Sequence, residues 1–162
     1  MVVSRLFLNL GAIQMKNLSF AAAFVGGAAL IVAYASTARA DGSSAPYGHG
    51  GMRFPQMNSI IAQYNKTGEL FRIEGECRSS CTELLAIKHV CIDPGATLEF
   101  HAALRSPDEP VDPGRNRHMA SYYNPKLRSF VLASHYMDSW EFHRVSGEEM
   151  IHRFGYRPCP GR

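Results

Sequence analysis

The stretch GECRSSCTELLAIKHVCIDPGATLEFH, residues 75–101, decides the fold class and carries the candidate chemistry. A strand-like run over 70–74 precedes it, and the serine pair Ser79 and Ser80 then opens a run with helical periodicity. A second strand-like run ends at His101. A serine at a strand-to-helix turn lies beside the free N–H groups of the helix, and a histidine ending a neighbouring strand could act as its base. The stretch therefore predicts the parts of a serine hydrolase site.

On both sides of this stretch, segments whose apolar residues recur with helical spacing take turns with segments of strand-like spacing. Helices are expected from 55 to the residue before 68, over 79–88, from 125 to about 137, and after a capping serine at 146 until 155; strands are expected over 70–74, 90–92, 96–101 and 141–145. Three prolines and alternating charges over 104–118 predict a long loop, of a length that often serves binding or closure. This order of elements predicts one α/β domain.

Residues 1–40 have the features of a secretory signal peptide. A short positive region follows Met15, which is an alternative start of translation; residues 20–35 are apolar, and Ala38-Arg39-Ala40 forms a small-x-small cleavage site. A retained membrane anchor is the alternative, but the apolar run is shorter than the roughly 20 residues that span a bilayer. We therefore expect a periplasmic or secreted protein that meets a membrane only through an uncleaved signal segment.

The chain after the signal peptide divides into a Gly/Ser-rich flexible leader over 41–49 and a folded domain over 50–162. An even cysteine count in an exported chain predicts two disulfides, with three pairings open. We favour Cys81–Cys91 and Cys77–Cys159. No second tight ligand pair accompanies these cysteines, so we expect no metal and no cofactor. A net charge of +3 without a basic run gives no reason to expect a nucleic-acid partner.

Four short motifs, in their order and spacing, resemble the Clp protease proteolytic subunit of the ClpP/crotonase fold, and more closely its small exported bacterial relatives. The motifs are Gly50-Gly51-Met52 before a helix, Gly75 to Ser79 at a turn, Phe100-His101 followed by Ala102-Ala103, and Ser146-Gly147-Glu148-Glu149 leading to Gly155-Tyr156. The resemblance covers roughly Gly50 to Cys159. It implies a truncated ClpP/crotonase-like βαβ spiral core in a single domain.

The resemblance also assigns roles to individual residues. It implies Ser79 as nucleophile, His101 as general base, Asp138 as the acid, and the backbone N–H groups of Gly51 and Ser80 as the oxyanion hole. Glu99 is an alternative acid, because alternation along a strand places it on the same face as His101. Each position also has an ordinary explanation: Ser79 as a helix cap, His101 as a structural hydrogen-bonding group, and Asp138 as a surface carboxylate.

The chain departs from the family at its beginning. The family fold starts with a βαβ unit ahead of the Gly-Gly loop, and here only residues 41–49 stand between the signal peptide and that loop. We therefore do not expect the assembled barrel or its ATPase partner, although a homo-oligomer is expected to cover an exposed sheet edge.

The functional hypothesis is an exported serine hydrolase, peptidase-like, that acts on a peptide or small acyl substrate through an acyl-enzyme. The alternative is a non-catalytic relative with a binding or structural role.

Overall fold

The computed structural model describes residues 40–161, and these form one small domain of mixed α/β type. The expected signal peptide, apart from Ala40, lies outside the described residues, as does Arg162. Within the described range, no helix is long and apolar enough to cross a bilayer.

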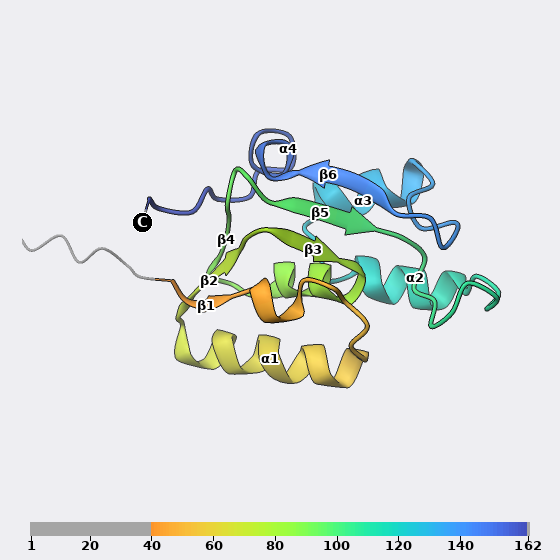
Figure 1. The fold of residues 1–162 in the computed structure, drawn as a ribbon, viewed down its shortest axis with the longest axis horizontal. Helices are drawn as coiled ribbons and strands as arrows, with labels where there is room; N and C mark the ends of the chain where they lie inside the picture. Colours follow the sequence, from red (N-terminus) through yellow and green to blue (C-terminus); the bar gives the residue numbers. More distant parts are fainter. Residues whose placement is uncertain (1–39, 162) are drawn as a thin grey trace, which may run out of the picture. The chain divides into compact units, whose positions relative to one another are not determined.

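Strands and helices are interspersed along the described chain (Figure 1). The elements are β1 (Ala40–Ser43), η1 (Ala45–Tyr47), α1 (Phe54–Thr67), β2 (Leu70–Ile73), β3 (Glu76–Arg78), η2 (Ser79–Ala86), β4 (Val90–Ile92), β5 (Thr97–Phe100), α2 (Pro113–Ala120), α3 (Pro125–Ala133), β6 (His143–Ser146) and α4 (Gly147–His152). The two elements labelled η are 3-10 helices.

The strands form two three-stranded sheets. In the first, the order is β1-β2-β4 and all neighbours are parallel. In the second, the order is β3-β5-β6, with β3 and β5 parallel and β5 and β6 antiparallel. The C-terminal tail extends the first sheet, because the N–H of Ile92 donates to the carbonyl of Arg157 and the N–H of Cys159 donates to the carbonyl of Ile92.

From β2 to β5, the chain alternates between the two sheets. β2 in the first sheet leads to β3 in the second and then to η2; β4 in the first sheet leads to β5 in the second and then to α2 and α3. A strand-strand-helix unit therefore occurs twice in succession. Its consequence is that β3 and β5, which belong to successive units, lie side by side in the second sheet (Figure 1).

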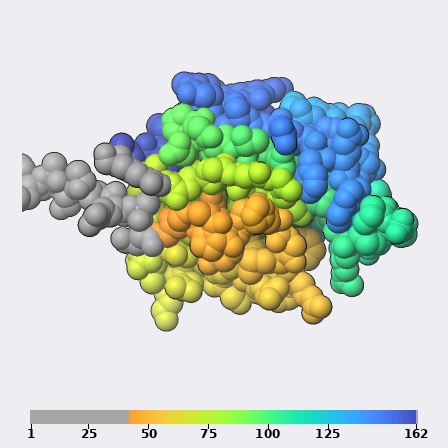
Figure 2. Space-filling model, viewed as in Figure 1, coloured from red at the N-terminus to blue at the C-terminus, as the bar shows by residue number. Residues whose placement is uncertain are grey.

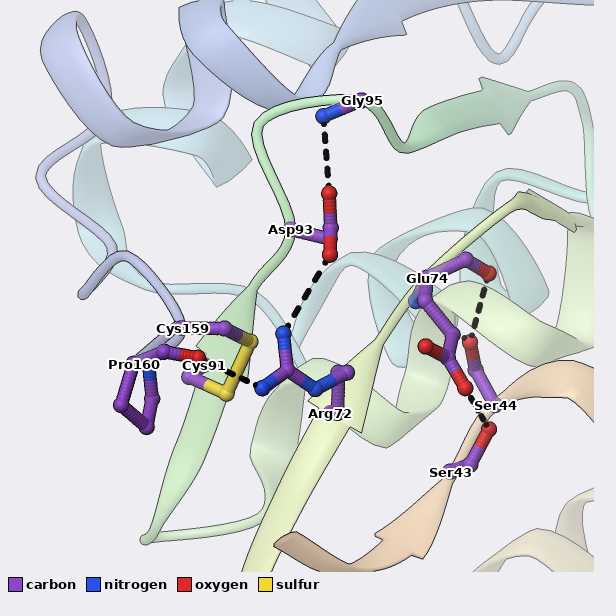
Figure 3. A network of polar contacts seen from close by, with 9 residues as sticks. All are labelled: Ser43, Ser44, Arg72, Glu74, Cys91, Asp93, Gly95, Cys159 and Pro160. Carbon is purple, nitrogen blue, oxygen red and sulfur yellow. Dashed lines mark hydrogen bonds and ion pairs between the residues drawn. A yellow bond between two sulfur atoms is a disulfide. The ribbon is translucent and has the colours of Figure 1, made fainter. Parts of the chain in front are cut away.

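β2 is the central strand of the first sheet, and all four of its residues are buried. Burial here does not follow the polarity of the residues, because a central parallel strand is covered on both faces. The buried Arg72 guanidinium forms an ion pair with Asp93 at 3.2 Å and donates to the carbonyl of Pro160 at 2.8 Å (Figure 3). These contacts satisfy a buried charge and attach the tail to the sheet.

The hydrophobic core lies between the sheets and the helices that cover them, with α1 on one side of the strands and α4 on the other (Figure 1). α1 buries Met57 and Ile61 and ends, as predicted, at the residue before Gly68, whose φ of 73° suits a glycine. Other fully buried apolar side chains are Phe71, Ile73, Leu84, Leu98, Phe100, Leu127, Val131 and Met150.

The flexible leader expected over 41–49 is instead structured as β1 and η1. The buried Ser44 explains the difference, because its N–H donates to the carbonyl of Arg72 and its hydroxyl oxygen accepts from the N–H of Glu74. The Ser43 hydroxyl donates to the Glu74 carboxylate at 2.6 Å (Figure 3). These partners lie about 30 residues away along the chain, so the local Gly/Ser composition gave no sign of them. In the space-filling view this segment lies against the one that carries β3 (Figure 2).

Other elements also differ in kind or extent from the prediction: β3 (Glu76–Arg78) was not predicted, and α3 ends at Ala133 and not near 137. The helix expected over 79–88 is the 3-10 helix η2 and ends at Ala86. The loop expected over 104–118 is shorter, because α2 begins at Pro113 with the Asp112 carboxylate accepting from the N–H groups of Gly114 and Arg115. A proline in the first turn is compatible with a helix, since its missing N–H would have no partner there.

All four cysteines form disulfides, as predicted, but the favoured pairing is wrong. The pairs are Cys77–Cys81 and Cys91–Cys159. Cys77 ends up beside Cys81 because the chain turns directly from β3 into η2, and this leaves Cys91 on β4 next to the tail that extends the first sheet. One disulfide therefore closes the turn around Ser79, and the other attaches the C-terminal tail.

Candidate active site

Ser79 and His101 each follow the carboxyl end of a strand, and these two strands are adjacent and parallel. Ser79 follows β3 and His101 follows β5, and the register pairs Arg78 with Glu99. In α/β sheets, the crevice at the carboxyl ends of parallel strands is the usual position of a binding site. The topology therefore places the two candidate catalytic residues at one edge of the second sheet.

Ser79 has a backbone conformation that is unusual for a residue with a side chain. Its φ is 53°, in the left-handed region, at the junction of β3 and η2. Such conformations cost about 1–2 kcal/mol for a non-glycine residue and are concentrated at functional sites. The fully buried Cys77–Cys81 disulfide holds both ends of this turn, while Ser79 itself is only half-buried. The disulfide thus constrains the turn around Ser79 but leaves Ser79 partly exposed to solvent.

The Gly-Gly loop packs directly against this serine turn. The N–H of Arg78 donates to the carbonyl of Gly48 at 2.9 Å, and the N–H of Met52 donates to the Ser80 hydroxyl at 2.9 Å. Between these two anchors, Gly50 and Gly51 have φ values of 70° and 80°. The loop and the first residues of η2 therefore lie together, which is the arrangement that two oxyanion donors on Gly51 and Ser80 would require.

His101 is buried, with 2% of its surface exposed, and neither ring nitrogen has a hydrogen-bond partner among residues 40–161. The rings of Trp140 and Phe142 contact it at centroid distances of 5.1 and 4.6 Å. Burial disfavours the charged imidazolium and lowers the pKa of His101 to about 4. His101 is therefore neutral at pH 7, the form that can accept a proton. It is not hydrogen-bonded to the Ser79 hydroxyl.

Neither candidate acid is hydrogen-bonded to His101. The Glu99 carboxylate is buried and lies within ion-pair distance of Arg144 at 2.6 Å and Arg78 at 3.1 Å. The Asp138 side chain is exposed and pairs with the Nδ1 atom of His135 at 2.6 Å. The structure thus brings Ser79 and His101 to one sheet edge with the glycine loop beside Ser79, but it engages both candidate carboxylates elsewhere.

Asn116, which the sequence analysis placed inside a loop, organises the region after His101. Its side chain is buried; the amide oxygen accepts from the N–H of Ala103 at 2.8 Å and the amide nitrogen donates to the carbonyl of Met137. The N–H of Ala102 donates to the carbonyl of Ser139 at 2.8 Å in the same region. Asn116 therefore joins the segments that follow β5 and α3. Nothing in its local sequence distinguishes it from a surface asparagine.

Glu83, in η2, is a second buried group that the sequence analysis did not single out. It is 1% exposed, and its Oε2 atom has no hydrogen-bond partner in the described part of the chain. Burial raises the pKa of the Glu83 carboxyl to about 8. Burial also raises the pKa of the nearby Tyr123 hydroxyl, which is hydrogen-bonded to Thr82, and the charge of Glu83 adds to this rise. Glu83 is therefore mostly protonated at pH 7. The helical pattern over 79–88 did not reveal that Glu83 faces inward.

A shallow groove of about 640 Å³ lies beside η1 and the ends of β2 and β4, and His101 is not among its lining residues. Its lining includes three carboxylates, from Glu74, Glu76 and Asp93. Asp93 and Glu76 pair with Arg72 and Arg78 respectively. Since these charges already have partners within the fold, the groove is a less suitable site for chemistry than the sheet edge at Ser79.

Comparison of the chain with models of known protein families and with curated proteins finds no match. The structure defines the class of protein as a small α/β domain with two disulfides, and the site at the carboxyl ends of β3 and β5 is the basis for any functional assignment.

Proposed function

We propose that this protein is an exported serine hydrolase, peptidase-like, that acts on a peptide or small acyl substrate through an acyl-enzyme. The observation that carries the proposal is the position of Ser79 and His101 at the adjacent carboxyl ends of β3 and β5. The left-handed backbone of Ser79 and the glycine loop packed against it add to this support.

The proposed reaction uses groups that the site contains. The Ser79 oxygen attacks the substrate carbonyl carbon while His101 accepts the hydroxyl proton, and the carbonyl oxygen becomes an oxyanion that accepts from the N–H groups of Gly51 and Ser80. Collapse of this intermediate breaks the bond to the leaving group, which takes the proton from His101. Water then attacks the acyl-enzyme with His101 again as the base, and the acid is released with Ser79 restored.

The proposed fold is a truncated ClpP/crotonase-like spiral. Its support is the strand-strand-helix unit that occurs twice, with successive strands assigned to different sheets. The proposed acid remains Asp138, with Glu99 as the alternative. In support of Asp138, its neighbour Ser139 is hydrogen-bonded to Ala102 directly after His101. A rotation of the Asp138 side chain away from His135 is required for it to orient the imidazole.

We propose the periplasm or the extracellular space as the location of the mature protein. Two disulfides occupy all four cysteines of the described chain. Disulfides of this kind form and persist in oxidising compartments. We also propose a homo-oligomer, because β6 is the terminal strand of the second sheet and presents an edge that a second copy could cover.

Labelling with a fluorophosphonate probe tests the hydrolase. The oxidised protein should be labelled, and peptide mass spectrometry should place the label on Ser79. Ser79→Ala should abolish labelling and His101→Gln should slow it by about 100-fold or more, in line with typical general-base contributions. Ser59→Ala, a serine exposed on α1, is the matched control and should leave labelling unchanged. A correctly folded, oxidised protein that takes no label would refute the proposal.

The non-catalytic alternative has an observation in its favour, since His101 is hydrogen-bonded neither to Ser79 nor to a carboxylate among the described residues. A deletion strain separates the two hypotheses. If the role is binding or structural, Ser79→Ala and His101→Gln will restore the wild-type phenotype. If the role is hydrolysis, neither variant will.

A further inference from the structure

The segment Trp140–Phe142 crosses the end of β5 as an arch of three residues, here called the aromatic arch. One end is fixed by the antiparallel pairing of His143 with Phe100. The other end is fixed where the N–H of Ala102 donates to the carbonyl of Ser139. The three residues of the arch therefore lie opposite one residue of the neighbouring segment, the candidate base His101.

The aromatic arch covers His101 on the side where the arch crosses the end of β5. Trp140 and Phe142 both place their rings against the His101 imidazole, at 5.1 and 4.6 Å between centroids. His101 is left 2% exposed with two unpaired ring nitrogens. A buried polar group without a partner is unfavourable, and a binding partner supplied from outside would remove this penalty.

The backbone of the arch is weakly attached between its two anchors, although the Arg78 guanidinium lies over the Phe142 ring at 5.3 Å from its centroid. In the described structure, the backbone groups of 140–142 make no backbone–backbone hydrogen bond, and the N–H of Glu141 donates only to the Ser139 hydroxyl. Trp140 is 36% exposed although it is one of the largest apolar side chains. Segments with few buried contacts and few backbone hydrogen bonds open locally at low free-energy cost.

We propose that the aromatic arch is a movable lid over His101, and that an acyl substrate displaces it on entering between Ser79 and His101. The substrate part of this proposal rests on the hydrolase function proposed above. The lid accounts for two features together: His101 follows the strand beside the serine turn, yet its nitrogens face no partner while the arch is closed. Opening also admits water, which raises the basicity of the imidazole from the low pKa of about 4 that burial imposes.

Diethylpyrocarbonate modification of the full chain, followed by peptide mass spectrometry, tests the lid without relying on catalysis. This reagent reacts with neutral, accessible imidazoles, and His152, whose side chain is 75% exposed, is an internal reference. If the arch opens locally, the His101 rate will be nearly independent of low urea concentrations. If His101 is reached only by global unfolding, its rate will rise steeply with urea in proportion to the surface exposed, and the lid is refuted.

Substitutions in the aromatic arch provide a second test of the lid with the same reagent. Trp140→Ala and Phe142→Ala should raise the His101 modification rate by tenfold or more at low urea, and Phe142→Leu should raise it less. Leu132→Ala is the matched control, because Leu132 on α3 is equally exposed at 38%. Rates within twofold of wild type in both alanine variants would overturn the proposal. Should an alanine variant fail to fold, Phe142→Leu and the urea dependence of the wild type still decide.

The failure of the lid and the failure of the hydrolase give different results. Trp140 is the only tryptophan in the chain, so its emission reports the arch directly. Fluorophosphonate bound to Ser79 should shift that emission to longer wavelength, because the displaced indole meets water. Urea-independent modification of His101 without any label on Ser79 would support the lid proposal and refute the hydrolase proposal. A label on Ser79 with no change in emission would retain the hydrolase and refute substrate-driven opening.

Discussion

Gly50 lies so close to Ser79 that a Cβ atom added to Gly50 would come within 2.9 Å of the Ser79 Cβ and within 2.7 Å of the Arg78 carbonyl oxygen. Real Cβ atoms essentially never approach other atoms so closely, and the second contact is with backbone that cannot easily yield. The neighbouring Gly51 has the same left-handed backbone but open space around its Cβ position. The two glycines therefore form a matched pair for testing the contact.

Gly50→Ala should destabilise the protein more than Gly51→Ala. Both substitutions place a methyl group on a left-handed residue, which costs about 1–2 kcal/mol. Only Gly50→Ala adds overpacking against the serine turn, for a further 1–3 kcal/mol or so. Urea denaturation measures the difference. Fluorophosphonate labelling of Ser79 should fall in Gly50→Ala, since the turn must move. Equal destabilisation by the two variants would show that the loop is not tightly packed against Ser79.

Asn116→Ala should lower the free energy of unfolding far more than a substitution in a surface loop, where the sequence predicted this residue. The substitution leaves the N–H of Ala103 and the carbonyl of Met137 buried without partners, at roughly 1–3 kcal/mol each. Asn58→Ala is the control, because Asn58 accepts one exposed hydrogen bond from the Tyr122 hydroxyl. Thermal or urea denaturation should show a small effect for Asn58→Ala. Similar effects for the two variants would mean that Asn116 does not join the two segments.

Sequence patterns predicted the elements whose signals are local. Gly68 caps the end of α1, β4 spans Val90–Ile92 as predicted, and Ser146 caps α4 by accepting from the N–H of Glu149. In each case the residue that ends or caps the element acts within a few positions of itself. Such features can be identified from one sequence, because their physical cause lies in neighbouring residues.

The features that were missed depend on partners far away in the chain. β1 is a strand only because β2 is beside it, and the disulfide pairing follows from where the tail meets β4. The candidate site divides in the same way. Ser79 and His101 could be proposed from their places at the ends of predicted elements, whereas the aromatic cover of His101 comes from residues 140–142, which are about 40 positions away along the chain.

The two disulfides should have separate effects on stability and on the site. Cys91–Cys159 joins residues 68 positions apart, and Cys77–Cys81 joins residues 4 apart. The chain-entropy model therefore predicts a loss of about 4 kcal/mol for Cys91→Ala with Cys159→Ala, and about 2 kcal/mol for Cys77→Ala with Cys81→Ala. Ser79 labelling should fall mainly in the second variant. Stability losses in the opposite order would contradict the model.

The buried Glu83 carboxyl should make stability fall as pH rises through the neutral range. The folded protein keeps the proton on Glu83 up to a pKa of about 8, whereas an unfolded chain releases it near 4.5. Between those values the folded state binds more protons, so the free energy of unfolding decreases with rising pH. His101 has the opposite sign: its folded pKa of about 4 lies below 6.5, so its contribution increases between pH 4 and 6.5.

Glu83→Gln isolates the first contribution, because the amide has no titrating proton and His101 is present in both proteins. The free energy of unfolding of the variant, minus that of wild type, should increase between pH 4.5 and 8 by an amount on the order of 4 kcal/mol. Urea denaturation at several pH values measures it, with Glu148→Gln on the exposed face of α4 as the control for removing a surface carboxylate. A difference that stays constant across this range would mean that Glu83 ionises normally in the folded protein, and that its carboxyl is solvated rather than enclosed between η2 and Tyr123.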